Sequence, residues 1–294
     1  MAGGYFMGPP ATRRRRGPRA PRGRFVLGLL LIVAGFGVAA VVAATRIDQT
    51  TRHKQIGTGY VVDSRLVGRR LQQRAIVPRG GGRGRGLLVL LQGRGDRPGD
   101  DFSDAMTAEL KRLGSRAPVV VEVDGGQHSY YHDRADGRWG SYVVREAIPE
   151  AVRRFGTDPK RVAIGGMSMG GFGALDLARL HPGRFCAVGG HSPALWRRAR
   201  DTAPGAFDNA RDFARHDVYG TVLRRPRAYA TEHLWIDVGR GDPFRAVDSA
   251  LARRLLARHR DVSFHVWPGG HGGAYFDAHV AGYLRFYARA LQRC

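Results

Sequence analysis

The sequence is poor in cysteine, and this shortage excludes one class of protein. Only Cys186 and Cys294 occur among the 294 residues, too few for the disulfide framework that stabilises many small secreted domains. Cys186 lies in an apolar stretch typical of a small core side chain. Whether it pairs with Cys294 stays open, because a chain of this length can bury enough apolar surface to be stable without a disulfide or a structural metal.

The sequence also has little lysine, which occurs only at positions 54, 111 and 160. The net charge of +23 therefore comes almost wholly from arginine, and seven arginines without any acid fall in residues 1–24. The remaining arginines are scattered. No zinc-finger spacing, recognition-helix pattern or aromatic–basic RNA motif accompanies them, which argues against nucleic acid as a partner. Attraction to anionic lipid or a cell-surface polymer fits this charge better.

Long apolar runs are rare, but residues 25–44 form one of twenty residues without a charge. A helix of that length is about 30 Å long, as thick as the hydrocarbon core of a bilayer. We therefore predict a basic cytoplasmic tail at 1–24 and a transmembrane anchor at 25–44, with the rest of the chain extracytoplasmic. The alternative is a signal segment cleaved after Ala44, which would give a secreted protein.

Residues 45–58 are polar and predict a linker, and residues 59–294 predict one catalytic domain. A strand pair is expected within 59–78, followed by apolar strands that alternate with amphipathic helices. This alternation predicts an α/β fold of the α/β-hydrolase type, with a mostly parallel sheet covered by helices on both faces. Residues 196–231 break the alternation and predict a cap insertion. The strands are expected at 87–92, 117–124, 161–165, 185–189, 233–238 and 262–267, and the helices at 142–155, 170–181, 247–259 and 274–291.

Ser168 is the candidate nucleophile. It stands in Gly166-Met167-Ser168-Met169-Gly170, a G-x-S-x-G pattern between an apolar strand and a helical run. The pattern alone is weak, because glycine fills 42 positions. Its context is that of a nucleophile elbow, where a sharp turn exposes the serine hydroxyl above the sheet.

A serine hydroxyl needs a base to remove its proton, and His271 is the candidate. It lies in a glycine-rich loop between the last predicted strand and the last helix, where an imidazole can approach the serine. His265 falls inside the strand and His279 inside the helix, so both are less suitable. His191 follows the strand after the nucleophile helix and is expected to line the pocket.

For the acid that orients His271, the chain order Ser–acid–His favours the segment from Ile236 to Phe244. Asp242 lies just past the expected strand end and is our first choice, ahead of Asp237 within the strand and the later Asp248. Two backbone N–H groups are needed for an oxyanion hole. We expect them from Met169, directly after the nucleophile, and from Arg94 in the loop after the strand at 87–92.

These motifs resemble the putative-esterase family of α/β hydrolases, which includes S-formylglutathione hydrolase (esterase D), feruloyl esterases and secreted mycolyltransferases. The likeness runs over residues 59–294 and is most specific in GMSMGGFGAL and the following HPGRF. The resemblance implies a triad of Ser168, Asp242 and His271 with Arg94 and Met169 in the oxyanion hole. IDVGRGDPF is similar to the esterase form of the acid loop, whereas mycolyltransferases carry a Glu near the position of Arg245.

The sequence therefore predicts a serine esterase that acts on small-molecule, lipid or sugar esters through an acyl-enzyme. One alternative is an acyltransferase that passes the acyl group to a sugar or lipid hydroxyl. Another is a catalytically inactive, membrane-tethered binding module. No metal and no organic cofactor is predicted.

Overall fold

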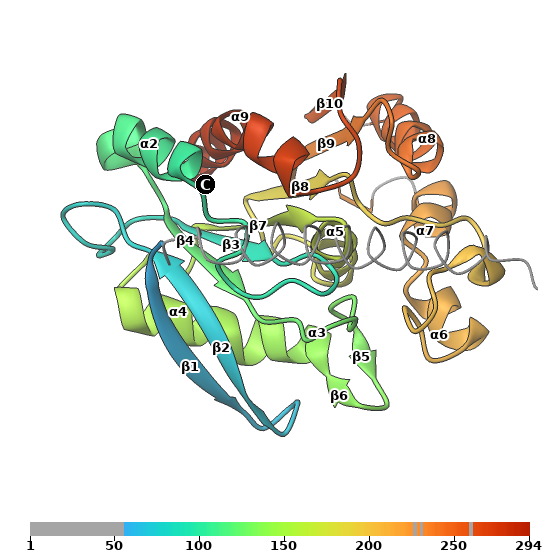
Figure 1. Cartoon of the computed structure of the whole chain (residues 1–294), viewed down its shortest axis with the longest axis horizontal. Coiled ribbons are helices and arrows are strands. Elements are labelled where there is room, and N and C mark those ends of the chain that lie inside the picture. Colours follow the sequence, from blue (N-terminus) through green and yellow to red (C-terminus); the bar gives the residue numbers. More distant parts are fainter. Residues whose placement is uncertain (1–55, 226–227, 230–231, 259–260) are drawn as a thin grey trace, which may run out of the picture. The chain divides into compact units, whose positions relative to one another are not determined.

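The computed structural model describes residues 56–294 apart from 226–227, 230–231 and 259–260. Eight of the strands form one sheet in the order β1-β2-β4-β3-β7-β8-β9-β10, and Figure 1 shows helices on both of its faces. These strands are β1 Thr58–Ser64, β2 Arg69–Ile76, β3 Leu87–Leu91, β4 Val119–Val123, β7 Val162–Met167, β8 Ala187–His191, β9 His233–Gly239 and β10 Val262–Trp267. A separate small hairpin is formed by β5 Asp133–Arg134 and β6 Gly137–Arg138.

The helices lie mostly between successive strands. They are α2 Asp104–Leu113, α3 Trp139–Tyr142, α4 Ile148–Phe155, α5 Met169–Leu180, α6 Ala210–Arg215, α7 Val218–Arg224, α8 Arg245–Leu256 and α9 Gly273–Arg293. A π-helical segment at Val143–Ala147 joins α3 to α4, and 3₁₀ turns occur at Gly114–Arg116 and Ala199–Asp201.

The sheet begins with a hairpin and is otherwise parallel. Strands β1 and β2 pair antiparallel, as do β2 and β4, and every later pair is parallel. The Gly68 amide donates to the Ser64 carbonyl at 2.9 Å and closes the turn expected between the first two strands. Because the carboxyl ends of parallel strands lie at the same edge of a sheet, the loops after β3, β7, β9 and β10 meet there.

The core has two layers, one on each face of the sheet. Along β3, Leu87, Val89 and Leu91 pack with α4, α5 and α8, whereas Leu88 and Leu90 pack with α2 and α9. All five side chains are buried. A strand covered on both faces needs apolar side chains at every position, which explains the uninterrupted run in the sequence. The predicted α/β-hydrolase architecture is confirmed.

The helix α2, the β5–β6 hairpin, and the helices α6 and α7 of the 196–231 segment were not expected from the sequence. The helix α2 buries Met106, Leu110 and Leu113 on a single face, and Ser103 caps it by accepting a hydrogen bond from the Met106 amide at 3.1 Å. Ser103 followed by Asp104 is an ordinary helix-start signal that could have identified it. The β5–β6 hairpin has two-residue strands, too short for a periodic pattern.

The membrane prediction concerns residues outside the described part of the chain. Segments 1–24 and 25–44, and all but the last three residues of 45–58, are not described. Within the described ranges, no helix combines the length and the apolar character needed to cross a bilayer. The anchor, the signal segment and the domain boundaries remain predictions.

The two cysteines form a disulfide with an S–S distance of 2.04 Å. Cys294 follows the end of α9, and Cys186 immediately precedes β8. The bond therefore fastens the last helix to the central sheet, and it resolves the pairing that the sequence left open.

Candidate active site

Ser168 stands at a strained turn between β7 and α5. Its backbone angles are φ 56° and ψ −115°, a region that non-glycine residues rarely adopt and that often marks a functional site. The turn is compact because a Cβ atom at Gly166 or at Gly170 would collide with the Leu91 carbonyl oxygen. The Ser168 amide donates to the His191 carbonyl at 3.1 Å, which fixes the turn against β8. The structure thus has the elbow that the G-x-S-x-G pattern predicts.

Ser168, His271 and Asp242 form a continuous chain of hydrogen bonds. The Ser168 hydroxyl lies 2.8 Å from His271 Nε2, and His271 Nδ1 lies 2.8 Å from Asp242 Oδ2. The carboxylate accepts from Nδ1–H, which leaves the Nε2 lone pair to accept the hydroxyl proton. The three residues come from the loops after β7, β10 and β9, so the parallel sheet brings all three together at one edge.

Asp242 is held in an ionised state behind the imidazole. Its side chain is fully buried, while that of His271 is 25% exposed. Burial by itself raises the pKa of Asp242, but hydrogen bonds from His271 and from the Phe244 amide, at 2.7 Å, outweigh it and lower the pKa below its ordinary value. A carboxylate placed in this way can orient the imidazole and stabilise its protonated form.

Asp237, the second choice for the acid, belongs to a different network. It is fully buried and accepts hydrogen bonds at 2.7–2.8 Å from the side chains of His191, Trp235, Tyr275 and Tyr283. None of these donors is His271. The expectation that His191 lines the pocket is wrong, because its ring is fully buried between Asp237 and the Tyr287 hydroxyl. His191 therefore links the sheet to α9 through Tyr287.

Asp248, the third choice for the acid, makes no hydrogen bond to His271, since both of its carboxylate oxygens lack a hydrogen-bond partner among the described residues. It is fully buried, and burial together with the charges of Asp242 and Asp237 raises its pKa well above the ordinary value. The two histidines judged less suitable as the base, His265 and His279, stack their rings on a tryptophan of β10, with centroid distances of 4.6 and 4.2 Å. The structure therefore brings together the three first choices for the triad.

The triad opens into a cavity of about 430 Å³. Ser168, His271 and Arg94 line it, and Met169 is the first residue of α5, directly after the serine. The Arg94 side chain donates to the Pro204 carbonyl at 2.9 Å and ties the loop after β3 to the 196–231 segment. The oxyanion-hole role of the Arg94 and Met169 amides remains a prediction that this placement supports.

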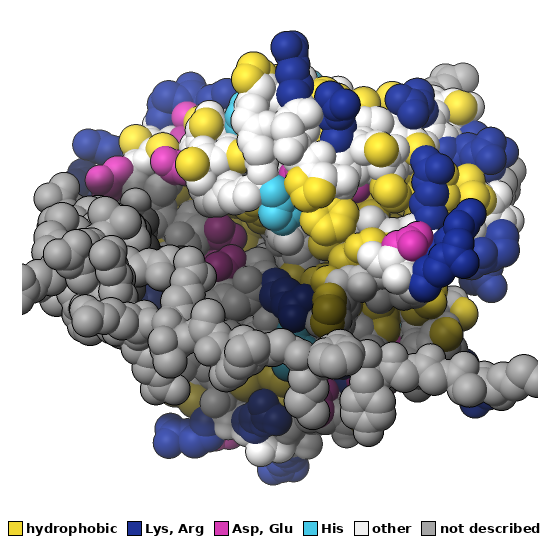
Figure 2. All heavy atoms as spheres, turned by 45° about the vertical axis from the view of Figure 1, so that its right-hand side comes forward, with side chains coloured by type: hydrophobic (Ala, Val, Ile, Leu, Met, Phe, Trp, Pro, Cys, Tyr) yellow, Lys and Arg dark blue, Asp and Glu magenta, His cyan; other side chains and the backbone are white. Residues whose placement is uncertain are grey.

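The cavity is lined by both apolar and acidic side chains. Tyr130, Ala194, Ala203 and Phe244 are among the former, and Asp96, Asp100 and Asp101 are the latter. In Figure 2, acidic, basic, histidine and hydrophobic side chains border a hollow on this side of the molecule. The sequence analysis did not single out the acids, although three within six residues after a parallel strand are a usable signal.

Asp101 faces a second buried acid, Glu122 on β4. Burial, followed by the charge of Asp96, raises the pKa of Asp101 to about 7. Burial and the charge of Asp101 raise the pKa of Glu122 well above its ordinary value. Glu122 also accepts a hydrogen bond from the Gly99 amide. Ionisation of either carboxyl therefore disfavours ionisation of the other, close to the cavity.

Comparison with known proteins identifies the family of this chain. The model of a family described as Putative esterase matches residues 68–287, about three quarters of the chain. The chain belongs to the Putative esterase family. The family predicted from the sequence motifs is therefore confirmed, and the matched range includes the elbow, the acid loop and the histidine loop.

Several curated proteins are similar to this chain over part of their length. An S-formylglutathione hydrolase of Paracoccus denitrificans is 31% identical over 178 residues, which is 55% of this chain and 62% of that protein. Esterase Rv1288 of Mycobacterium tuberculosis is 26% identical over 224 residues, 64% of this chain and 49% of the relative. The chain thus spans less than two thirds of either relative.

Solved structures share the fold at lower identity. A ferulic acid esterase superposes with a TM-score of 0.68 at 19% identity, covering 79% of this chain and 97% of that structure. The M. tuberculosis protein MPT51 superposes with a TM-score of 0.56, also at 19% identity, with coverages of 79% and 97%. At these identities the likeness concerns the fold, and it agrees with the sheet described above.

Proposed function

We propose that the protein hydrolyses carboxylic esters through an acyl-enzyme formed on Ser168. The observation that carries this proposal is the hydrogen-bonded chain from Ser168 through His271 to Asp242, set at a strained elbow in an open cavity. Membership of the Putative esterase family supports the same chemistry.

The proposed reaction has two halves. Ser168 Oγ attacks the ester carbonyl while His271 Nε2 takes the hydroxyl proton, and the protonated imidazole then gives that proton to the departing alcohol. A water molecule next attacks the acyl-enzyme, again with His271 as base, and releases the acid. Asp242 keeps its charge throughout and stabilises the imidazolium.

The negative charge that develops on the carbonyl oxygen needs donors. The Met169 amide stands at the N-terminus of α5, where the helix dipole favours an anion. The Arg94 amide belongs to the loop after β3, and Arg94 lines the cavity. Loss of one such donor in comparable sites costs about 3–4 kcal/mol of transition-state stabilisation.

The two kinds of lining side chain favour different halves of an ester. The apolar side chains of Tyr130, Ala194 and Phe244 suit an acyl chain or ring. Asp96 and Asp100 can accept hydrogen bonds from hydroxyls. We therefore propose an ester whose alcohol is a sugar or another polyol, rather than one with a strongly anionic leaving group such as the glutathione conjugate named for several relatives.

The Cys186–Cys294 disulfide supports the proposal that the domain works outside the cytoplasm. Structural disulfides persist in oxidising compartments and are rare in the cytosol of most organisms. This agrees with the anchor or signal segment that residues 25–44 predict.

The test is turnover of p-nitrophenyl esters of graded acyl length by the full-length protein and its Ser168→Ala variant. We expect the wild type to release p-nitrophenol and the variant to lose about 10⁴–10⁶ of kcat with an unchanged unfolding midpoint. Products formed with added sugar or polyol acceptors separate hydrolysis from acyl transfer. A wild type as slow as the variant would leave only the binding-module hypothesis.

A further inference from the structure

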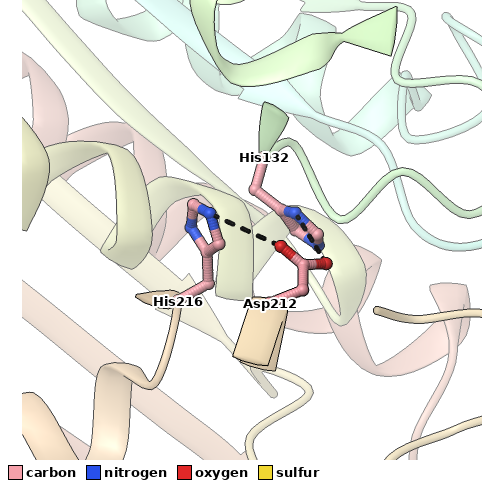
Figure 3. Close-up of side chains that lie close together, drawn as sticks. All are labelled: His132, Asp212 and His216. Atoms are coloured by element: carbon pink, nitrogen blue, oxygen red, sulfur yellow. Dashed lines mark ion pairs between the residues drawn. The ribbon is translucent and has the colours of Figure 1, made fainter. Parts of the chain in front are cut away.

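A second cluster of functional side chains lies away from the triad, where the 196–231 segment contacts α5. His132, from the loop after β4, and Asp212 and His216, on and just after α6, place one ligand atom each within 4.8 Å of the others. Figure 3 shows the Asp212 carboxylate beside the two imidazole rings, facing one nitrogen of each. The side chains of His132 and Asp212 are fully buried, and that of His216 is 11% exposed.

Each imidazole uses its outward nitrogen as a donor. His132 Nε2 lies 3.1 Å from the Ala206 carbonyl oxygen, and His216 Nδ1 lies 2.7 Å from Asp176 Oδ2. In a neutral imidazole the remaining nitrogen then carries a lone pair. Those nitrogens are His132 Nδ1 and His216 Nε2, and both face Asp212, at 3.7 and 3.9 Å.

Two lone pairs and a carboxylate facing one another repel unless a cation or protons lie between them. His132 Nδ1 has no hydrogen-bond partner among the described residues, although it is completely buried. A buried polar atom without a partner has lost its hydrogen bonds to water without replacement, which destabilises the fold. Protonation of both rings would relieve this repulsion only at the expense of another. The rings stack with centroids 4.5 Å apart, so two imidazolium charges would repel each other.

Asp212 is already partly satisfied. Its oxygens accept from the Asp208 amide and from the Arg215 guanidinium, both at 2.9 Å. The Arg215 side chain is 57% exposed and can turn to solvent. Two carboxylate oxygens offer about four acceptor positions, so capacity for a further ligand bond remains.

We propose that His132 Nδ1, Asp212 and His216 Nε2 bind a single zinc ion that fastens the 196–231 segment to the body of the enzyme. Two imidazoles and a carboxylate are a common zinc ligand set, with a water or the second carboxylate oxygen in the fourth position. Tetrahedral ligand atoms lie about 3.3 Å apart at ordinary zinc bond lengths. The two nitrogen–oxygen separations of 3.7 and 3.9 Å run to different oxygens of Asp212, and the three ligand atoms lie within 4.8 Å of one another. The side chains therefore have to draw together when the ion binds.

The surroundings match a zinc site beyond the ligands themselves. Asp176 on α5 accepts from His216 Nδ1–H, which is the carboxylate–histidine arrangement that commonly orients zinc ligands. Arg179 pairs with Asp176 in turn. The ion would therefore connect α6 to the loop after β4 directly and to α5 through Asp176.

The consequence of binding reaches the cavity. Tyr130, two residues before His132, lines the cavity and contacts Trp196 and Phe207 of the 196–231 segment, with ring centroids 5.5 and 6.1 Å apart. Zinc at this position would hold this part of the apolar lining in place. The role is structural, because none of the three ligands lines the cavity of Ser168.

The test is titration of zinc chloride into the chelator-treated, dialysed full-length protein by calorimetry. We expect one bound ion and a rise of about 5 °C or more in the unfolding midpoint at roughly 100 times Kd. Asp212→Asn and His216→Gln should each weaken binding more than 100-fold, and Asp176→Asn by about 10–100-fold. His233→Gln, which alters a pair with Asp261 elsewhere, should leave the affinity unchanged.

Two further measurements keep the test decisive. The His271→Ala variant must keep the same stoichiometry, which separates this site from zinc held by the triad imidazole. Cobalt added to the wild type should give the intense visible absorption of a four-coordinate ion, whether or not the ligand variants fold. Absence of binding and of a midpoint shift in the wild type, or unchanged affinity in Asp212→Asn and His216→Gln, would overturn the proposal.

Discussion

His271 Nε2 lies 2.8 Å from Ser168 Oγ, although 103 positions separate the two residues in the chain. The contact exists because β7 and β10 run in the same direction in one sheet, so the loops that follow them reach the same edge. The sheet thus determines the chemistry: it places a base beside a hydroxyl that the elbow exposes.

Replacement of Asp242 by Asn should abolish most of the activity with little loss of stability. The side-chain amide that this change creates carries no charge, and its NH₂ group can donate to His271 Nδ1. The imidazole would then lose both its orientation and its stabilising anion. We expect kcat to fall by about 10³–10⁴. The measurement is steady-state hydrolysis of p-nitrophenyl acetate, with urea unfolding of the same preparation.

Asp237→Asn is the matched control for that variant. Asp237 carries four buried hydrogen bonds, so the change should lower the free energy of unfolding by about 3–5 kcal/mol. The folded fraction should keep a kcat within about tenfold of wild type. If Asp237→Asn removed activity and Asp242→Asn did not, the assignment of the acid would be wrong.

Gly170→Ala should misplace the nucleophile. The new methyl group would meet the Leu91 carbonyl oxygen, and the backbone must shift because neither partner is a flexible side chain. A displacement of about 1 Å at the elbow is expected to cost about 10²-fold in kcat. Activity together with the reaction rate of Ser168 toward a fluorophosphonate measures the effect.

Gly282→Ala on α9 is the comparison. There the nearest atom to a new Cβ is an Arg285 guanidinium nitrogen at 3.9 Å. The change should raise stability by about 0.5–1 kcal/mol and leave kcat alone, because alanine loses less backbone entropy on folding than glycine. Equal activities of the two alanine variants would argue against the tight elbow.

Cys294→Ser should lower the stability of the oxidised protein. The disulfide closes a loop with a sequence separation of 108, which restricts the unfolded chain. We expect a loss of about 2–4 kcal/mol in urea unfolding. Reductant should lower the midpoint of the wild type to that of the variant and have no effect on the variant. A wild-type midpoint insensitive to reductant would contradict this role of the bond.

Glu122→Gln should stabilise the protein at alkaline pH. In the folded state burial and the Asp101 charge raise the pKa of Glu122, so the native protein keeps a proton that the unfolded chain releases above about pH 4.3. The wild type therefore loses stability as pH rises above that value. Gln mimics the protonated acid, so we expect the free energy of unfolding to rise relative to wild type at pH 8 and to change little at pH 4.

Glu109→Gln should show the opposite pH dependence in the same unfolding experiment. Hydrogen bonding to Arg112 lowers the pKa of Glu109, so its ionised form contributes stability above the unfolded pKa and loses it as pH falls. The substitution should be destabilising at pH 8 and less so at low pH. If the stability changes of the two variants followed the same pH dependence, Glu122 would not keep a proton in the folded protein.

The sequence predicted those parts of the fold and site that depend on local patterns. The apolar runs of β3, β4 and β7 follow from burial on both faces, and the elbow follows from Gly166, Ser168 and Gly170. The choice of His271 and Asp242 followed from their positions after strands, which the structure places within hydrogen-bond distance of one another.

Features that depend on contacts between distant segments could not be predicted. The sequence places His191 just after an expected strand, as a pocket residue would be, but in the structure it ends β8 and its ring is buried against Asp237 and Tyr287. Asp101 and Glu122 meet only because the loop after β3 folds against β4. Asp212 and His216 are four residues apart, yet the third member of their cluster, His132, lies in another loop.

The most direct test of Ser168 as nucleophile is labelling of the full-length protein with a fluorophosphonate, followed by peptide mass mapping. We predict one covalent adduct, on the peptide that contains Ser168, and its loss in Ser168→Ala and strong slowing in His271→Ala. A wild-type protein that stays unlabelled, or that carries its adduct on another residue, would contradict the assignment.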